Sequence, residues 1–599
     1  MTQSRKSLLR RIVAIAKPYW FANEKQSVAW PWPLSKVLSP LSIPAKWVGR
    51  GLLLLLLVGL VAINLLNVKL NYAWGDILNY VQEWALATGA GKTADSQAAK
   101  DAFYTSIYSI GLVFAYGTFI VVAYRWIRSK LALSWRQWMT NHFMQKYFER
   151  RNYYRVGNNI NVDNPDERMH QDIDATVSMT LSLALTVLDS IITLGSFATV
   201  LWAISHSLTW IVIGYSLVGS LIIVLFGRRL VLLNFMQLKL EADYRFALIH
   251  VRNHTESIAF YRGEERELNT VRGRFAGVVE NAHKLINWTR NVGLFQTGFD
   301  YFTTIIPYLV IAPLVFAGAA KIGAFQQASM AFSMILGALA VFVSNFQSLA
   351  QYAANINRLG TFAESLDEPD PRPTPEQPRI TTVVEPRIAT VDMTLMTPNY
   401  ARTLIEHLTT EVPAGSGLLV AGRSGTGKSS LLRGFSGLWN SGSGTIVHPD
   451  HGLMMFLPQA PYMILGSLRD QLLFPNAAAT DEQLLALLKL VNLPELADRV
   501  GGLDAVHDWD MKLSPGERQR VAFARLLLAK PKFAFLDEAT SSLDEANEDY
   551  LYSLLQKTGT TFVSVGHRPS LRKYHANVLE LLGEGKWRQM PTGQYDPRV

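Results

Sequence analysis

The feature that most constrains the fold of this chain is a glycine-rich loop, Gly422-Arg423-Ser424-Gly425-Thr426-Gly427-Lys428-Ser429. The apolar run 418–421 before it predicts a short buried strand, and the residues from Ser430 onward predict the start of a helix. Strand, glycine-rich loop and helix together are typical of a phosphate-binding loop, because backbone N–H groups and the helix N-terminus face the anion. Lys428 is then placed to reach the β- and γ-phosphates, and the Ser429 hydroxyl to bind Mg²⁺. We therefore expect the loop to bind a nucleoside triphosphate. The alternative is a glycine-rich turn that contains a lysine without this function.

Length and composition show that this loop is only part of the protein. At 599 residues the chain is too long for one domain, and 49% of its residues are hydrophobic, which is high for a soluble ATPase. The formal charge of +9 is spread along the sequence without a strongly basic block, so we expect no nucleic-acid partner. The sequence contains no cysteine, which excludes disulfides and thiolate metal sites.

Residues 1–46 are rich in basic and aromatic side chains. This mixture predicts a segment in the cytoplasmic interface of a lipid bilayer, and a soluble amphipathic helix is the alternative. The segment lacks the short apolar core and the small-residue cleavage site of a signal peptide. The residues concerned are Arg5, Lys6, Arg10, Arg11, Lys17, Lys25, Tyr19, Trp20, Phe21, Trp30 and Trp32.

Residues 47–364 contain six apolar stretches long enough to cross a bilayer, which takes about 20 residues of helix. We therefore expect an α-helical transmembrane domain with six spans, with kinks at Pro307 and Pro313 in the fifth. The stretches are 51–70, 104–124, 177–204, 208–226, 292–318 and 328–349.

The connections between these stretches differ in length and charge. The third and fourth stretches are joined by a very short turn at 205–207, whereas the connections 125–155 and 228–290 are long and rich in arginine and lysine. The excess of basic residues places both long connections in the cytoplasm, and the less basic connection 73–102 outside. The periodicity of 238–248 predicts that the long connections continue the spanning helices.

A change of composition marks the second domain. Residues 365–378 are charged, rich in proline and without periodicity, which predicts a linker. From residue 379 to 599, short β-like runs alternate with helical ones, as in an α/β domain. Strands ending in polar residues and short polar motifs follow the phosphate loop in a fixed order. They are Met454–Gln459, Leu513–Glu517, Phe533–Glu538, Ser541–Asp544 and Phe562–His567, and a helix is predicted to open with Arg518.

These motifs, in this order, resemble those of the ATP-binding-cassette family of transporters, and the six preceding stretches resemble the exporter-type membrane fold of that family. The resemblance implies ATP and Mg²⁺ as cofactors and an ATP hydrolase coupled to transport. Asp537 and Gln459 would complete the Mg²⁺ site with Ser429, and Glu538 would act as general base on the attacking water. His567 would contact the γ-phosphate and orient Glu538, and Lys428 would contact the β- and γ-phosphates.

The resemblance also implies a homodimer, because each chain carries one cassette. Ser514 and Gly516 would contact the ATP bound by the opposite subunit, and Tyr400 lies where the family places an aromatic ring on the adenine. The signature here reads Leu-Ser-Pro-Gly-Glu, whereas the usual motif has two glycines and ends in glutamine. Pro515 removes one N–H donor, and Glu517 replaces the glutamine.

Several stretches resemble one branch of the family. Residues 457–471, 429–439, 164–168 and 258–265 are similar to the peroxisomal fatty-acyl branch, and 135–140 with 153–155 are similar to its bacterial SbmA/BacA-type relatives. The bacterial resemblance implies uptake of bulky hydrophilic compounds, such as cobalamin and antimicrobial peptides, across the inner membrane. The eukaryotic resemblance implies fatty acyl cargo. An exporter of lipids or drugs, a soluble cassette ATPase without spans and an ATP-gated channel are further alternatives.

Two other groups of residues carry hypotheses. Residues 164–168 and 256–265 lie in the cytoplasmic connections, and we expect them to transmit closure of the cassettes to the spans, the alternative being surface helices without a special function. Asp189 and Asp300 lie inside predicted spans, where a carboxylate is costly. A cavity-lining acid, an intramembrane hydrogen bond and a proton site are the three interpretations.

Overall fold

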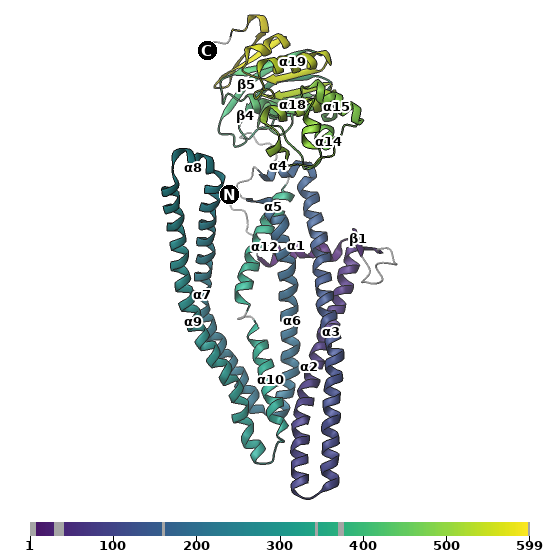
Figure 1. Cartoon of the computed structure of the whole chain (residues 1–599), viewed down its shortest axis with the longest axis vertical. Helices are drawn as coiled ribbons and strands as arrows, with labels where there is room; N and C mark the ends of the chain where they lie inside the picture. Colours follow the sequence, from purple (N-terminus) through teal and green to yellow (C-terminus); the bar gives the residue numbers. More distant parts are fainter. Residues whose placement is uncertain (1–7, 29–40, 158–161, 342–344, 369–376, 597–599) are drawn as a thin grey trace. The chain divides into compact units, whose positions relative to one another are not determined.

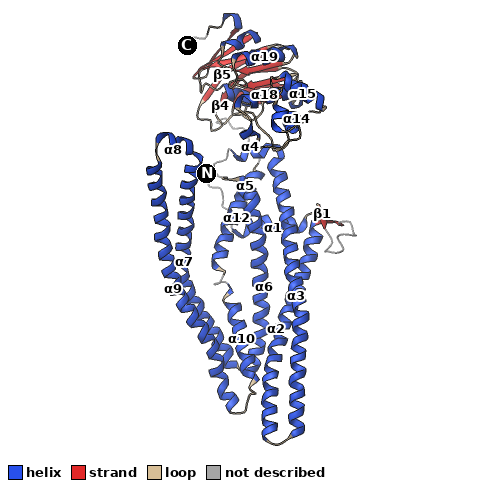
Figure 2. Cartoon of the chain, in the orientation of Figure 1, coloured by secondary structure: helices blue, strands red, loops and turns tan. Residues whose placement is uncertain are grey.

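The computed structural model describes residues 8–28, 41–157, 162–341, 345–368 and 377–596. The chain forms two compact units, Met1–Pro369 and Asp370–Val599. Figure 2 shows that the first unit is almost wholly helical and that most strands gather in the second. The predicted linker, 365–378, falls largely on residues outside those described.

The first unit consists of long helices joined by short turns (Figure 1). Helix α2 has 45 residues and is therefore about 68 Å long, roughly twice the thickness of a bilayer core. Its apolar part exposes Leu54, Val58 and Leu65, as expected for a surface facing lipid. The helices are α1 (Leu8–Phe21), α2 (Ala45–Gly89), α3 (Thr93–Phe148), α4 (Asn152–Gly157), α5 (Pro165–Glu167), α6 (Ile173–Ile204), α7 (His206–Asn253), α8 (Thr255–Tyr261), α9 (Glu264–Phe316), α10 (Gly323–Leu339) and α12 (Phe346–Asp367).

Some of the predicted spans agree with the observed helices better than others. Among the described residues, four helical stretches are long and apolar enough to cross a membrane: Ala45–Gly89, Thr93–Gly157, Pro165–Ile204 and Glu264–Phe316. The sixth predicted span, 328–349, is wrong as one helix, because α10 ends at Leu339 and α12 begins at Phe346. Helix α9, which carries the fifth predicted span, ends at Phe316 and continues through Pro307 and Pro313. The number of six spans stays a prediction.

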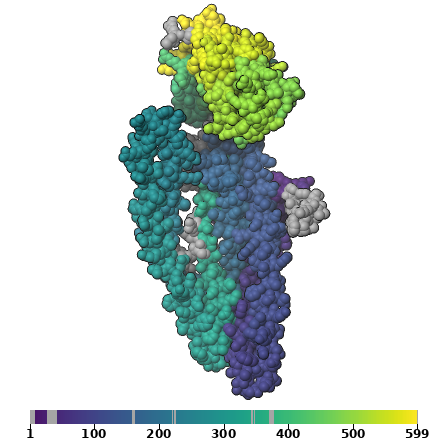
Figure 3. Space-filling view, viewed as in Figure 1, coloured from purple at the N-terminus to yellow at the C-terminus, as the bar shows by residue number. Residues whose placement is uncertain are grey.

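The long connections continue the spanning helices, as predicted. Helices α7 and α9 extend far past the predicted stretches, pack along each other and are joined by the short α8. Figure 3 shows this pair as one continuous teal column. Between α6 and α7 only Ser205 intervenes, and its hydroxyl caps α7 by accepting a hydrogen bond from the Leu208 N–H.

The N-terminal segment is more structured than its composition predicts. Helix α1 is followed by an antiparallel pair, β1 (Lys25–Val28) and β2 (Leu41–Pro44). Tyr19, expected in the membrane interface, is fully buried, with its ring stacked on Trp135 and its hydroxyl 3.0 Å from the Ser134 hydroxyl. Phe21 is exposed, whereas Trp30 and Trp32 lie outside the described residues.

Two sheets organise the second unit. The larger has the strand order β12-β11-β6-β10-β9-β8, and all neighbours are parallel except β11 and β12. Strands β6, β9 and β10 are buried on both faces, which explains why their sequences are mostly apolar. The smaller sheet has the order β3-β7-β4-β5. The strands are β3 (Thr381–Val384), β4 (Ile388–Met396), β5 (Thr403–Val412), β6 (Gly417–Gly422), β7 (Gly442–His448), β8 (Met454–Leu457), β9 (Phe533–Asp537), β10 (Thr561–Val565), β11 (Asn577–Gly583) and β12 (Lys586–Pro591).

Helices cover this larger sheet, as Figure 1 shows for α18 and α19. The α13 helix starts directly at the phosphate loop, and α18 starts at the signature motif. The helices of the second unit are α13 (Lys428–Phe435), α14 (Leu468–Leu473), α15 (Asp481–Leu490), α16 (Leu496–Val500), α17 (Trp509–Lys512), α18 (Pro515–Ala529) and α19 (Glu545–Lys557).

Candidate functional site

The candidate site lies at one edge of the larger sheet. Strands β6, β10, β9 and β8 are neighbours and parallel, so their carboxyl ends meet at the same edge. Ligands of open α/β sheets bind at this kind of edge. The predicted strands are confirmed, but β8, β9 and β10 end one or two residues earlier than expected. Their polar residues Gln459, Glu538 and His567 consequently stand in the loops that leave the sheet.

The phosphate loop connects β6 to α13 as predicted. Gly422 and Gly427 have positive φ angles of 141° and 103°. A Cβ at Gly422 would lie 2.4 Å from the Leu581 carbonyl oxygen, so only glycine fits there. The buried Lys428 donates hydrogen bonds of 2.9 Å to the carbonyl oxygens of Gly422 and Arg423. Burial lowers the pKa of its ammonium group.

The rest of the loop fits an anion. Arg423, Ser424 and Gly425 are exposed, and the Thr426 hydroxyl closes the turn by donating to the Arg423 carbonyl at 2.9 Å. Ser429 and Ser430 lie in the first turn of α13, where backbone N–H groups lack intrahelical partners and attract phosphate. The loop is thus shaped to surround a triphosphate.

Oxygen donors meet beside this loop. The Ser429 hydroxyl donates a 2.9 Å hydrogen bond to Asp537 at the end of β9. Burial raises the pKa of the Asp537 carboxyl, and the bond from Ser429 opposes that rise. A hydroxyl and a carboxylate are hard ligands that suit Mg²⁺, which usually binds one or two protein groups together with phosphates and water. The residues present therefore fit a magnesium ion.

Glu538 is the centre of a second group of side chains. One carboxylate oxygen accepts a 2.9 Å hydrogen bond from Gln459 Nε2, and the other lies 3.1 Å from His567 Nε2. The backbone of Glu538 has φ = 47°, a conformation that is uncommon for residues other than glycine. Its N–H donates to the Val565 carbonyl of the neighbouring strand at 3.1 Å, which fixes the turn. Two predicted site residues, Gln459 and His567, thus converge on the carboxylate of a third, Glu538.

The signature motif starts α18 earlier than predicted, at Pro515 and not at Arg518. Ser514 caps the helix by accepting a hydrogen bond from the Glu517 N–H, and the Glu517 carboxylate accepts one from the Ser514 N–H at 2.8 Å. Pro515 occupies the first helical position, where its missing N–H would have no intrahelical partner. Gly516 is close to neighbouring backbone, because a Cβ there would lie 3.2 Å from the Ser542 carbonyl oxygen.

Other polar residues that sequence reasoning missed fix the loops around the site. Gln519 accepts from the Ser542 N–H at 2.9 Å and donates to the Ser541 hydroxyl at 3.2 Å. Arg568 donates to the Leu543 carbonyl at 2.7 Å. The buried Arg525 donates to the carbonyl oxygens of Gln471 and Tyr462, and burial lowers its pKa to about 10. Their only sequence signal was proximity to the signature and to the strand ending in His567.

Tyr400 lies in the turn between β4 and β5, with φ = 57°. Its hydroxyl donates a 3.0 Å hydrogen bond to the Pro378 carbonyl, and the side chain is half-buried. Contact of this ring with adenine stays a prediction.

The two carboxylates predicted within spans differ. Asp189 on α6 accepts a 2.9 Å hydrogen bond from Asn64 Nδ2 of α2, and Thr193 donates to the Asn64 side-chain oxygen at 2.8 Å. Asn64 is 2% exposed, whereas Asp189 and Thr193 are half-buried, so the cluster joins the facing sides of α2 and α6. Asp300 on α9 is exposed. For Asp189, the interpretation as an intramembrane hydrogen bond agrees with the structure.

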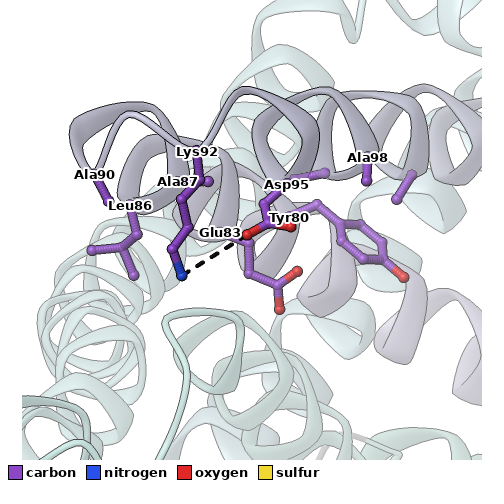
Figure 4. A pocket seen from close by; sticks show the side chains of 10 residues that line it. Tyr80, Glu83, Leu86, Ala87, Ala90, Lys92, Asp95 and Ala98 are labelled. Atoms are coloured by element: carbon purple, nitrogen blue, oxygen red, sulfur yellow. Dashed lines mark ion pairs between the residues drawn. The ribbon is translucent and has the colours of Figure 1, made fainter.

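A pocket of about 590 Å³ lies where α2 ends and α3 begins (Figure 4). Lys92 and Asp95 form an ion pair at 4.0 Å at the start of α3, and Glu83 pairs at 2.7 Å with Lys321, which does not line the pocket. The three charged side chains that line the pocket are therefore each in an ion pair, and the pocket shares no residue with the phosphate loop.

Comparison with known proteins gives the family. The model of the ABC transporter transmembrane region 2 matches residues 38–316, and the ABC transporter model matches residues 405–541. An uncharacterized ABC transporter ATP-binding protein of Synechocystis sp. is 45% identical over 91% of this chain and 82% of its own length. The chloroplastic ABC transporter D family member 2 of Arabidopsis thaliana is 34% identical over 96% and 86%.

Two further similarities bear on branch and fold. The lysosomal cobalamin transporter ABCD4 of Homo sapiens is 33% identical over 77% of this chain and 82% of its own. A bacterial Atm1-family ABC exporter with ATP bound superposes with a TM-score of 0.68 over 91% of this chain and 95% of that one, at 17% identity, and so shows the fold. This chain belongs to the ABC transporters of the D family, multi-pass membrane proteins of exporter-type fold that couple ATP hydrolysis to transport.

Proposed function

We propose that this chain works as a homodimer in the bacterial inner membrane and uses ATP to import bulky hydrophilic compounds such as cobalamin and antimicrobial peptides. The observation that carries the ATP-driven step is the Glu538 carboxylate, which lies between Gln459 and His567 at 2.9 and 3.1 Å. A carboxylate fixed on both oxygens at the edge of a nucleotide-binding sheet is suited to polarise one water molecule.

The other residues would position the nucleotide. Lys428 and the N–H groups of the phosphate loop would bind the β- and γ-phosphates, while Ser429, Asp537 and Gln459 would hold Mg²⁺. The ion would neutralise charge on the phosphates. His567 would keep Glu538 oriented and contact the γ-phosphate. Tyr400 would stack on the adenine.

One cassette per chain supports the homodimer. Ser514 and Gly516 stand at the start of the 15-residue helix α18, where N–H groups attract phosphate. In a dimer they would contact the ATP of the opposite subunit, and two sites would form. The basic connections support a cytoplasmic position of the N-terminus and the cassette.

Two observations favour hydrophilic cargo. A D-family relative with 33% identity is named a cobalamin transporter. The cluster of the buried Asn64 with the half-buried Asp189 and Thr193 also places hydrogen-bonding groups between the membrane helices, where they are costly without a function.

Fatty acyl compounds, lipids or drugs are the second candidate cargo. The structural neighbour is named an exporter, and helices α2 and α3 expose large apolar side chains such as Leu55 and Phe119. An apolar substrate could reach such a protein from the bilayer.

Uptake of labelled cobalamin and of a labelled proline-rich peptide tests the proposal. The host lacks its own importers, and the wild type is compared with Glu538→Gln at equal membrane levels. Uptake that the substitution abolishes supports an ATP-driven importer. Equal uptake in both contradicts the dependence on ATP, and no uptake in either contradicts the cargo and favours acyl compounds or export.

A further inference from the structure

The carboxylate of Glu517 is engaged on both oxygens. One accepts a 2.8 Å hydrogen bond from the Ser514 N–H, and the other accepts one from Arg499 Nη2 at 2.6 Å. The Glu517 side chain is 13% exposed, whereas that of Arg499 is 50% exposed. Burial acts to raise the pKa of Glu517, but the bonds from Ser514 and Arg499 lower it below its usual value, so the group is ionised at neutral pH.

The backbone of Arg499 is well positioned for this contact. Arg499 belongs to α16, whose residues Leu496 and Val500 are buried in the core. Gly501 and Gly502 follow with φ angles of 95° and 107°, and they turn the chain immediately after the helix. Arg499 is therefore presented to α18 by a packed element, although half of its side chain is exposed.

Neighbouring arginines are directed elsewhere. Arg518, next to Glu517 in the sequence, lies 3.1 Å from Asp510. Arg520 donates to the Asn492 carbonyl at 2.8 Å. Among the ion pairs of the described residues, the Arg499 contact is the one that neutralises Glu517.

This charge matters because of where it lies. The inference rests on the proposed function, in which Ser514 and Gly516 contact a triphosphate. A glutamine at the end of the signature would be neutral, whereas Glu517 adds a negative charge beside an anion. An unpaired carboxylate there would repel ATP.

We propose that Arg499 is a positioning residue that neutralises Glu517 and thereby allows the Leu-Ser-Pro-Gly-Glu form of the signature to bind ATP. Arg499 acts through Glu517 and not by touching the phosphates. Without Arg499, Glu517 would repel bound ATP and the transition state alike. Loss of Arg499 should therefore raise KM and leave kcat nearly constant.

A double-mutant cycle on the full-length protein in nanodiscs tests this. ATPase activity is measured as a function of ATP concentration for the wild type, Arg499→Gln, Glu517→Gln and the double variant. We expect Arg499→Gln to raise KM about three- to tenfold in the wild-type background. In the Glu517→Gln background the same substitution should change KM less than about twofold. Arg499→Lys, which keeps the charge, should retain most of the affinity.

The controls separate this proposal from simpler explanations. Arg387→Gln removes a half-exposed arginine that pairs with Glu385 at 2.7 Å in the connection between β3 and β4, and it should leave KM unchanged. If Arg499→Gln raises KM equally in both backgrounds, Arg499 acts directly or structurally, and the proposal is wrong. An unchanged KM in Arg499→Gln also contradicts it. A wild type that hydrolyses no ATP would instead contradict the proposed function.

Discussion

His567 Nε2 lies 3.1 Å from Glu538 Oε1, and the two residues come from neighbouring parallel strands, β10 and β9. The register of this pair of strands brings Val565 beside Asp537, so the residues that follow leave the sheet together. A contact between residues 29 positions apart is thus set by the sheet itself.

Glutamine has nearly the same shape as glutamate, so Glu538→Gln removes the proposed general base with little change in packing. Glu538→Gln should lower ATP hydrolysis at least about a hundredfold, because the amide cannot accept a proton from water. ATP binding should persist, since the phosphate loop is untouched. Phosphate release and equilibrium binding of labelled ATP measure the two effects. A variant that hydrolyses ATP at the wild-type rate would show that another group is the base.

Acid should weaken the second unit through His575. This histidine is buried against Phe562, and burial lowers its pKa from 6.5 to about 4. Between pH 6.5 and pH 4 the unfolded chain therefore binds more protons than the folded one. The free energy of unfolding is constant above about pH 6.5 and falls as the pH drops toward 4, by up to about 3 kcal/mol.

Hydrogen exchange of β10 and β11 at pH 7.5, 6.5 and 5.5 measures this loss of stability. His575→Asn should flatten the pH dependence, while the exposed His407→Asn should keep it. An identical pH dependence in His575→Asn and the wild type would contradict the assignment.

The tip between α8 and α9 should couple hydrolysis to transport. Glu264 begins α9, whose first turn also contains Glu265 and Glu267. Glu264→Lys should abolish transport while basal ATP hydrolysis continues. The variant should still fold, because losing a negative charge at the N-terminus of α9 costs only about 0.3–1 kcal/mol. Glu280→Lys makes the same charge change farther along α9 and serves as control. Normal transport by a folded Glu264→Lys protein would contradict the coupling role.

The hydrogen bond of Asp189 should stabilise the membrane unit. Asp189→Leu leaves the buried Asn64 amide without this acceptor and should cost about 1–3 kcal/mol. Asp189→Asn retains a carbonyl oxygen and should cost less. Thermal unfolding in detergent measures both, with Asp300→Leu as the control at an exposed carboxylate. Equal melting of Asp189→Leu and wild type would show that the bond contributes nothing.

The candidate site could be predicted well because its residues follow short strands with local signatures. The loop at Gly422–Ser429 and the strand before Asp537 each carry their own apolar run and polar end, and parallel pairing then brings the ends together. Helix α18 starts three residues before the predicted Arg518, because Pro515 is favourable at the first position of a helix.

Contacts between distant elements could not be predicted. The Arg499–Glu517 pair depends on how α16 packs, and the burial of Tyr19 depends on the aromatic residues of α3. The end of α10 at Leu339 could not be predicted, because the sequence stays apolar beyond it, at Ala340 and Val341.

The most direct test of ATP-driven import uses sealed proteoliposomes preloaded with labelled cobalamin, with the cassettes facing outward. ATP and Mg²⁺ are added outside, and release of label from the lumen is counted for the wild type and Glu538→Gln. Import toward the cassette side predicts ATP-dependent release by the wild type and none by the variant. Release that is independent of ATP, or equal in the two proteins, would contradict the account.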